Sequence, residues 1–199
     1  MGTLETTCRC GEVVVRLDVP RKGGCTRTVC YCDDCQTAPR ALGAEAHVLG
    51  PGSGTDLVQS TPDLLHIDKG ADRLGVLRLS PKGLFRWYAR CCDTPVFNTL
   101  TNLKLGFVGV IIPAEASKQV DTVFGAPRAH VFTTTARPRS EAPRKDVGFS
   151  VAGYGVLSRL IAAKISGRSK HNPLMQEDGT PIAEIRVLTK EERHDARPG

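Results

Sequence analysis

Three cysteines within six residues constrain this chain more than any other feature of its sequence. Cys30, Cys32 and Cys35 are separated by one and by two residues. A short loop with this spacing directs its sulfur atoms at one point, and three thiolates fill three corners of a tetrahedral zinc site. The fourth corner is then open to an exchangeable ligand, as in zinc sites that perform chemistry. The sequence therefore predicts a metal site at these three cysteines with a catalytic role.

A closed, purely structural zinc site is the alternative for the same three cysteines. Cys25 or a histidine would then supply the fourth ligand, and closed four-coordinate sites are the commoner use of cysteine-rich zinc. The five histidines follow no ligand spacing. Cys25 stands alone in the sequence, and we expect it to be a small buried hydrophobic residue rather than a ligand. Both alternatives stay open on the sequence.

Two further cysteine pairs flank this motif, Cys8 with Cys10 before it and Cys91 with Cys92 after it. Such close spacing favours metal chelation over disulfides, because a bridge between near neighbours is strained. The first residues show no basic segment followed by an apolar run, so no secretory signal is visible. We therefore expect a cytoplasmic protein that holds one or two Zn²⁺ ions per chain.

The apolar pattern of the first half predicts a mainly β fold. Over residues 11–19, apolar residues alternate with others from Val13 onward, which is the period of a half-buried strand. Short β-prone segments separated by turn signals follow at 26–31, 44–49, 56–60, 63–68, 76–80 and 84–88. We expect an antiparallel β domain over residues 1–100 that carries the cysteines.

Residues 101–199 are expected to form a C-terminal extension packed on this domain, with strands at 105–112 and 129–135 and a helix near 150–167. In the helix Val151, Tyr154, Leu157, Ile161 and Ile165 recur at three- and four-residue steps. This stripe predicts a helix that packs on the core rather than one that lies on a membrane. The longest apolar run, 105–114, is too short to span a bilayer, so we expect no membrane partner.

The cysteine clusters together resemble the glutathione-dependent formaldehyde-activating family. The first match is Cys8-Arg9-Cys10-Gly11 followed by a strand, and the second is the Cys-x-Cys-x-x-Cys motif at Cys30. The third is the aromatic segment 85–97, which is similar to the family's closing Cys-x-x-Cys-Gly-(Thr/Ser)-Pro-Leu. The resemblance covers roughly residues 5–100 and implies a compact fold of twisted antiparallel β-sheets.

The resemblance also implies two kinds of zinc site. The outer cysteines, here Cys8, Cys10 and Cys92, would hold a structural zinc. The central Cys30, Cys32 and Cys35 would hold a catalytic zinc whose fourth position accepts the sulfur of glutathione. This chain departs from the family pattern in having Ala89 where the first closing cysteine stands.

Cys91 is the substitute for the missing ligand only if the backbone turns sharply, because neighbouring residues in a strand point to opposite faces. The outer site is therefore rebuilt with Cys91, left with three sulfurs, or absent.

Two functions are compatible with these features. The first is a zinc-dependent carbon–sulfur lyase that adds a thiol such as glutathione to formaldehyde or another small carbonyl. The second is a zinc-stabilised binding module for a protein or another anionic partner, because most of the net charge of +6 lies in residues 101–199. We expect no nucleic acid partner, since that half lacks a basic stripe interleaved with exposed aromatic residues.

Overall fold

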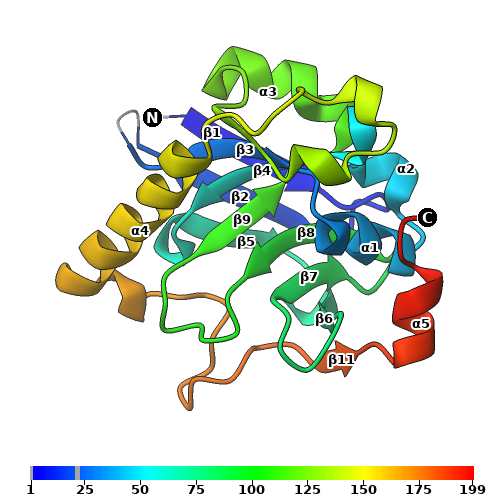
Figure 1. Cartoon of the computed structure of the whole chain (residues 1–199). Helices are drawn as coiled ribbons and strands as arrows, with labels where there is room; N and C mark the ends of the chain where they lie inside the picture. The colour runs from blue at the N-terminus through cyan, green and yellow to red at the C-terminus, as the bar shows by residue number, and fades with distance from the viewer. Residues whose placement is uncertain (1, 21–22) are drawn as a thin grey trace.

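The computed structural model of this chain describes residues 2–20 and 23–199, and two β-sheets form its centre (Figure 1). A three-stranded antiparallel sheet has the order β1-β2-β5. Its strands are β1 (Gly2–Thr7), β2 (Val14–Val19) and β5 (Leu65–Lys69).

An eight-stranded sheet has the order β10-β3-β4-β9-β8-β7-β6-β11. Its strands are β3 (Thr26–Cys30), β4 (Thr55–Ser60), β6 (Leu74–Arg78), β7 (Phe85–Ala89), β8 (Thr94–Thr99), β9 (Val108–Ile111), β10 (Ala129–Val131) and β11 (Ile185–Val187). The pairs β10–β3 and β11–β6 are parallel, and the other pairs are antiparallel. The protein is thus mainly β, as the sequence predicts.

The main core lies between the two sheets. Val15 and Leu17 of β2 are buried against residues of the large sheet that include Trp87 and Phe97, whose ring centroids lie 5.4 Å apart. The indole N–H of Trp87 donates to the hydroxyl of Thr99 at 2.9 Å, so this buried polar group is satisfied. Alternation along β2 puts its apolar side chains inward and Arg16 and Asp18 outward, as predicted for residues 11–19.

Five helices complete the fold: α1 (Asp33–Ala41), α2 (Glu45–Val48), α3 (Ser117–Phe124), α4 (Phe149–Ile165) and α5 (Lys190–Asp195). A second apolar cluster on the large sheet joins Cys30 and Leu57 of its strands to Cys35 of α1 and Ala152 of α4. Thr189 and Glu192 form a capping box at the start of α5. Among the described residues, no helix has the length and apolarity that a bilayer crossing requires.

The strand predicted at residues 44–49 is wrong, because this segment contains α2. Gly43, with φ of 58°, ends the turn after α1, and the amide of Val48 then donates to the carbonyl of Ala44 at 3.1 Å. Ala44 and Val48, which are both buried, are four residues apart and therefore face the same side of a helix. In this six-residue segment apolar residues alternate with Glu45 and His47, which also fits a strand, but the helical spacing of Ala44 and Val48 decides the structure.

The prediction that the apolar stripe of the helix near 150–167 packs on the core is wrong. Helix α4 forms as predicted, but the residues buried on it are Ala152 and Ala163. Gly155 faces β3 so closely that an added Cβ would lie 2.8 Å from the hydroxyl of Thr26. The small residues therefore face the protein, and the large apolar residues of the predicted stripe face outward.

Strands from the second half of the chain are part of the large sheet. β9 lies between β4 and β8, β10 extends the sheet beyond β3, and β11 extends it beyond β6. One continuous hydrogen-bonded sheet therefore runs through residues on both sides of position 100.

Candidate metal centres

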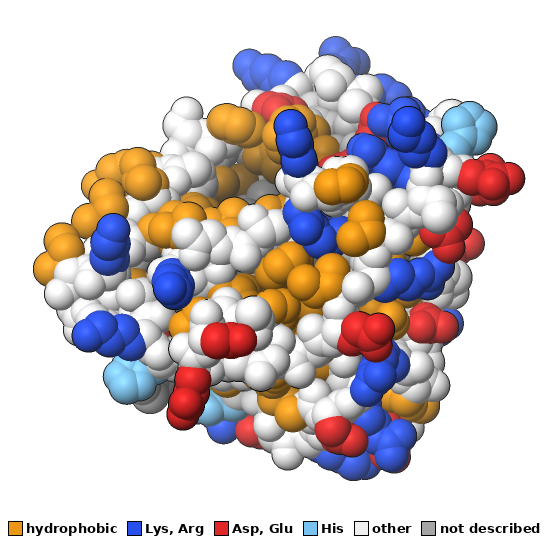
Figure 2. All heavy atoms as spheres, turned by 90° about the horizontal axis from the view of Figure 1, so that it is seen from below, with side chains coloured by type: hydrophobic (Ala, Val, Ile, Leu, Met, Phe, Trp, Pro, Cys, Tyr) orange, Lys and Arg blue, Asp and Glu red, His pale blue; other side chains and the backbone are white. Residues whose placement is uncertain are grey.

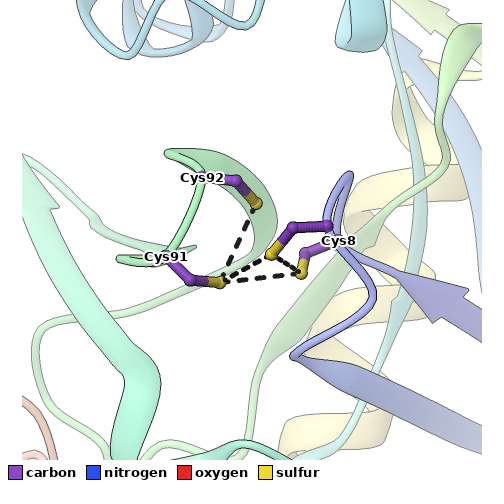
Figure 3. Close-up of side chains that lie close together, drawn as sticks. Cys8, Cys91 and Cys92 are labelled. Carbon is purple, nitrogen blue, oxygen red and sulfur yellow. Dashed lines mark hydrogen bonds between the residues drawn. The ribbon is translucent and has the colours of Figure 1, made fainter.

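Two groups of cysteines come together in the structure. The first contains Cys8 and Cys10, from the loop after β1, and Cys91 and Cys92, from the turn between β7 and β8 (Figure 3). The second contains Cys30, Cys32 and Cys35. Within each group the sulfur atoms lie within 4.8 Å of one another. All seven cysteines predicted as metal ligands thus fall in one of the two groups, and Cys25 falls in neither.

The first group has the spacing of a tetrahedral thiolate site. The Cys10 and Cys91 sulfurs are 3.1 Å apart, and the Cys8 sulfur lies 3.5 Å from that of Cys10 and 3.8 Å from that of Cys91. The Cys91 and Cys92 sulfurs are 3.9 Å apart. Four sulfurs around one zinc, at a Zn–S length of about 2.3 Å, would be about 3.8 Å apart. The four cysteines therefore fit a zinc ion, whereas a disulfide would need a separation of about 2.05 Å.

A tight turn lets the neighbours Cys91 and Cys92 face the same point. β7 ends at Ala89, which pairs with Thr94 of β8, so both cysteines stand outside the ladder. Asp93 has a left-handed φ of 52°, which reverses the chain after the two cysteines. Of the three alternatives that the sequence leaves open, the geometry is that of the site rebuilt with Cys91.

Arg9 ties the two halves of this four-cysteine group together. Its backbone N–H and its Nε donate to the Thr94 hydroxyl at 3.2 and 3.3 Å, and its Nη2 donates to the Cys92 carbonyl. The amide of Val13 donates to the Cys8 sulfur at 3.2 Å. These contacts hold the loop after β1 against the turn and bring a positive charge beside the sulfurs.

The four sulfurs differ in acidity. Burial opposes ionisation of Cys92, but the Thr94 hydroxyl, the Cys10 amide and the neighbouring thiols together lower the pKa of Cys92 to about 6. Burial and the hydrogen bonds to Cys10, Cys8 and Cys92 instead raise the pKa of Cys91. One thiolate in this group is therefore formed before any metal arrives.

The second group is built by the end of β3 and the start of α1. Cys30 is the last residue of β3, Cys32 is the residue that precedes α1, and Cys35 lies in the first turn of the helix. The amide of Cys35 donates to the carbonyl of Cys32 at 3.0 Å, which fixes this turn. A helix N-terminus favours negative charge, so the position suits thiolates. The strand end and the first helical turn thus bring the three sulfurs together.

Arg86 of β7 reaches this three-cysteine group from the large sheet. Phe85 and Trp87 point into the main core, and the strand's alternation therefore places Arg86 on the other face, opposite α1. Its side chain is buried, and its Nη1 lies 3.9 Å from the sulfur of Cys35. Within residues 2–20 and 23–199, Arg86 makes no ion pair with a carboxylate.

A buried guanidinium without a carboxylate needs another anion, because an unpaired buried charge is costly. Hydrogen bonds from the thiols of Cys30 and Cys32, together with the charge of Arg86, hold the pKa of Cys35 well below its usual value. Hydrogen bonding to the other two cysteines, together with burial, raises the pKa of Cys30. Three thiolates on one Zn²⁺ carry a net charge of −1, which Arg86 would offset.

The three-cysteine group has no fourth protein ligand in the part of the chain that the structure describes. Neither Cys25 nor a histidine joins it. Cys30 and Cys35 are buried and Cys32 is partly exposed, so access to the sulfurs is from the side of Cys32. A metal held here would have three sulfur ligands and one position for a ligand from outside.

Segments of the second half close around α1. Arg137 pairs with Asp33 at 3.1 Å, and Arg193 of α5 pairs with Asp34 at 3.4 Å. The Gln36 side-chain amide donates to the Thr135 carbonyl at 2.8 Å. The two arginines lie 104 and 159 positions from the aspartates that they contact. Their long separation in the sequence gives no local signal for these contacts.

A small cavity lies beside Tyr31, the residue between Cys30 and Cys32 in the sequence. It has a volume of about 240 Å³ and is lined in part by Tyr31, His130, Asp56 and Glu141. The Tyr31 hydroxyl and His130 Nδ1 are 3.2 Å apart. Burial lowers the pKa of His130, which favours its neutral form at physiological pH. No local pattern in the sequence predicts this pair.

Comparisons with known proteins identify a family and include a distant structural likeness. No curated protein matches the chain. A crystal structure of a Rhodobacter sphaeroides protein, a Northeast Structural Genomics target, is 19% identical in sequence with a TM-score of 0.36. That likeness covers 54% of this chain and 83% of the other chain. The model of a family of unknown function, DUF6151, matches residues 2–186. The chain therefore belongs to the DUF6151 family.

Proposed function

We propose that this protein binds two zinc ions with different tasks. The four sulfurs of Cys8, Cys10, Cys91 and Cys92 complete a tetrahedral ligand set, which is typical of a structural site. The site joins the loop after β1 to the turn between β7 and β8, so a metal here would fix the small sheet to the large one.

The three-cysteine site would hold the second zinc with one ligand position open. The observation that carries this proposal is the buried guanidinium of Arg86, which lies 3.9 Å from the Cys35 sulfur. It has the charge needed to offset three thiolates on Zn²⁺, and it makes no ion pair with a described carboxylate.

The reaction that suits such a site is the addition of a thiol to a small carbonyl. Zinc bound there would supply a Lewis-acidic position at which an external thiol, such as that of glutathione, loses its proton at neutral pH. For formaldehyde, the S–H bond breaks, a C–S bond forms and the carbonyl oxygen gains the proton, which gives S-hydroxymethylglutathione. Cys30, Cys32 and Cys35 would hold and orient the centre, and the apolar residues around Cys30 and Cys35 would limit access of water.

Resemblance to the glutathione-dependent formaldehyde-activating family supports this proposal through three motifs in the same order. Those motifs include every cysteine of the two groups. Ala89 departs from the family's pattern, and Cys91 would replace the missing sulfur. Sites made only of thiolates also suit a reducing compartment, which supports a cytoplasmic location.

Zinc analysis and a cobalt-substituted protein test both parts of the proposal. We expect two zinc ions per chain by elemental analysis of untagged protein purified without chelators. Glutathione should then change the visible absorption of the Co²⁺-substituted protein, and S-methylglutathione, which has no free thiol, should not.

A response to both compounds, or to neither, would contradict the open position. In that case the protein is a zinc-stabilised binding module. One zinc per chain would contradict the two-site arrangement, and the cysteines that react with an alkylating reagent would identify the missing site.

A further inference from the structure

Helix α4 exposes the apolar side chains of its outer face. The exposed fractions are 75% for Tyr154, 56% for Leu157, 50% for Ile161 and 82% for Ile165. These positions follow one another at three- and four-residue steps, so they lie along one side of the helix. The helix has seventeen residues, which gives it a length of about 25 Å. A helix that is apolar on both sides is normally covered on both sides.

The exposed apolar surface continues beyond the helix. Phe149, at the start of α4, makes an edge-to-face contact with Phe132, with ring centroids 5.9 Å apart, and about half of each side chain is exposed. An open groove of about 440 Å³ between α4 and the large sheet is lined mainly by apolar residues, among them Phe107, Val131 and Leu160. Figure 2 shows hydrophobic side chains gathered over the α4 side of the molecule, with Lys and Arg side chains beside them. Such a contiguous patch marks an interaction surface.

The charged side chains on and around α4, over residues 147–176, are all Lys or Arg and therefore positive. No Asp or Glu occurs between Asp146 and Glu177, whereas Arg159, Lys164, Arg168 and Lys170 do. Arg159 is turned inward and donates to Thr26, and Arg168 pairs with Asp63. Lys164 and Lys170 are exposed, and no carboxylate in the described ranges 2–20 and 23–199 pairs with them. The apolar stripe is therefore bordered by free positive charge.

We propose that α4 docks on the surface of an anionic lipid bilayer. Its outer side chains would enter the boundary between headgroups and acyl chains, while the lysines contact anionic headgroups. A second copy of the chain fits less well, because a two-fold contact along α4 would double the uncompensated positive charge at the seam. The proposal replaces the expectations that this helix packs on the core and that the protein has no membrane partner. It does not depend on the chemistry of the metal centres.

Vesicle flotation with the full-length, zinc-loaded protein tests the proposal. We expect binding to vesicles of phosphatidylcholine mixed with phosphatidylglycerol, little binding to phosphatidylcholine alone, and release as salt is raised. Ile161→Asp and Leu157→Asp should each abolish flotation, and their far-UV circular dichroism should match the parent because both side chains are exposed. Lys164→Glu with Lys170→Glu should weaken flotation at low salt. Val123→Asp, which alters an exposed apolar residue of α3, is the matched control and should float normally.

Three results would overturn the proposal. The first is no flotation, or equal flotation with neutral and anionic vesicles. The second is normal flotation of the Ile161→Asp variant. The third is a dimer in sedimentation velocity that Ile161→Asp converts to a monomer, without lipid binding by the parent, which would assign the outer face of α4 to a second copy.

Discussion

The Sγ atoms of Cys10 and Cys91 lie 3.1 Å apart although the two residues are 81 positions apart in the sequence. This contact fastens the loop after β1, which belongs to the small sheet, to a turn of the large sheet. Replacing Cys10 or Cys91 with Ser should therefore remove one zinc per chain and lower the free energy of unfolding by at least about 3 kcal/mol. Thermal unfolding and elemental analysis of the same samples measure both effects.

Cys25→Ser is the control for this prediction, because Cys25 is a partly buried cysteine that belongs to neither group. Its zinc content should equal that of the parent. An unchanged melting temperature in the Cys10→Ser variant would contradict a structural role for the four-cysteine site.

Cys32→Ser should remove a metal ion without destabilising the fold, unlike Cys10→Ser. Cys32 is the most accessible of the three central cysteines, and its loss leaves two sulfurs for the metal. We expect this variant to lose one zinc and the cobalt response to glutathione, while its circular dichroism spectrum stays native. Global unfolding of the variant would show that the three-cysteine site is structural.

Arg86→Gln should weaken metal binding at the three-cysteine site and leave the four-cysteine site intact. The substitution removes the positive charge beside Cys35 and keeps a polar side chain of similar length. Outer-shell partners of metal ligands are worth roughly 10–100-fold in affinity, and we expect a loss of this size. Competition with a chromophoric chelator measures it, and Arg86→Lys, which keeps the charge, should recover part of the affinity. Equal metal affinities in the parent and in Arg86→Gln would contradict the inference that Arg86 offsets the charge of the three thiolates.

The metal-free four-cysteine group should show an unusually acidic thiol at Cys92. With a pKa of about 6, Cys92 should react with iodoacetamide at pH 7, and its rate should fall as the pH drops through about 6. Cys91 has a raised pKa and should react with iodoacetamide only at higher pH, although its side chain is more exposed than that of Cys92. Rates measured on Cys91→Ser and Cys92→Ser separate the two neighbours, and the reverse order of reactivity would contradict the assignment.

The depressed pKa of Cys92 also affects stability without metal. Because its folded value lies below the usual thiol value of about 8.5, Cys92 favours the folded state above that pH. Its contribution declines as the pH falls toward about 6. Urea unfolding of the metal-free parent and of Cys92→Ser at pH 6 and pH 9 measures this contribution.

Local patterns in the sequence predicted most strands and the grouping of Cys30, Cys32 and Cys35. The grouping of Cys8, Cys10 and Cys92 was implied only by the family resemblance, and the place of Cys91 stayed open. Strand β2 follows its alternation of apolar residues, and the close spacing of Cys30, Cys32 and Cys35 brings their sulfurs together wherever the segment lies. Strands β1, β8 and β11 were not predicted. In β8, Pro95 is a residue that argues against a strand. In the structure Pro95 lies opposite Tyr88, where the register shifts at a β-bulge.

Contacts between distant segments could not be predicted in this way. The alternation of Phe85, Arg86 and Trp87 indicates that Arg86 faces away from the core, but nothing local indicates that Cys35 lies there. For α4 the helical period is visible in the sequence, but the period does not indicate which side of the helix faces the protein. Its large residues follow a helical period, but the side of the helix that faces the protein carries Ala152, Gly155 and Ala163, which leave room for close packing against β3.

The position of β9 has a consequence for any shortened form of the protein. Because β9 fills the space between β4 and β8, a chain that stops at residue 100 would leave both of those strands with open edges in the middle of the sheet. Unprotected edges pair with other chains. The cysteine-bearing half should therefore aggregate when it is produced alone, and metal loading has to be studied on the full-length chain.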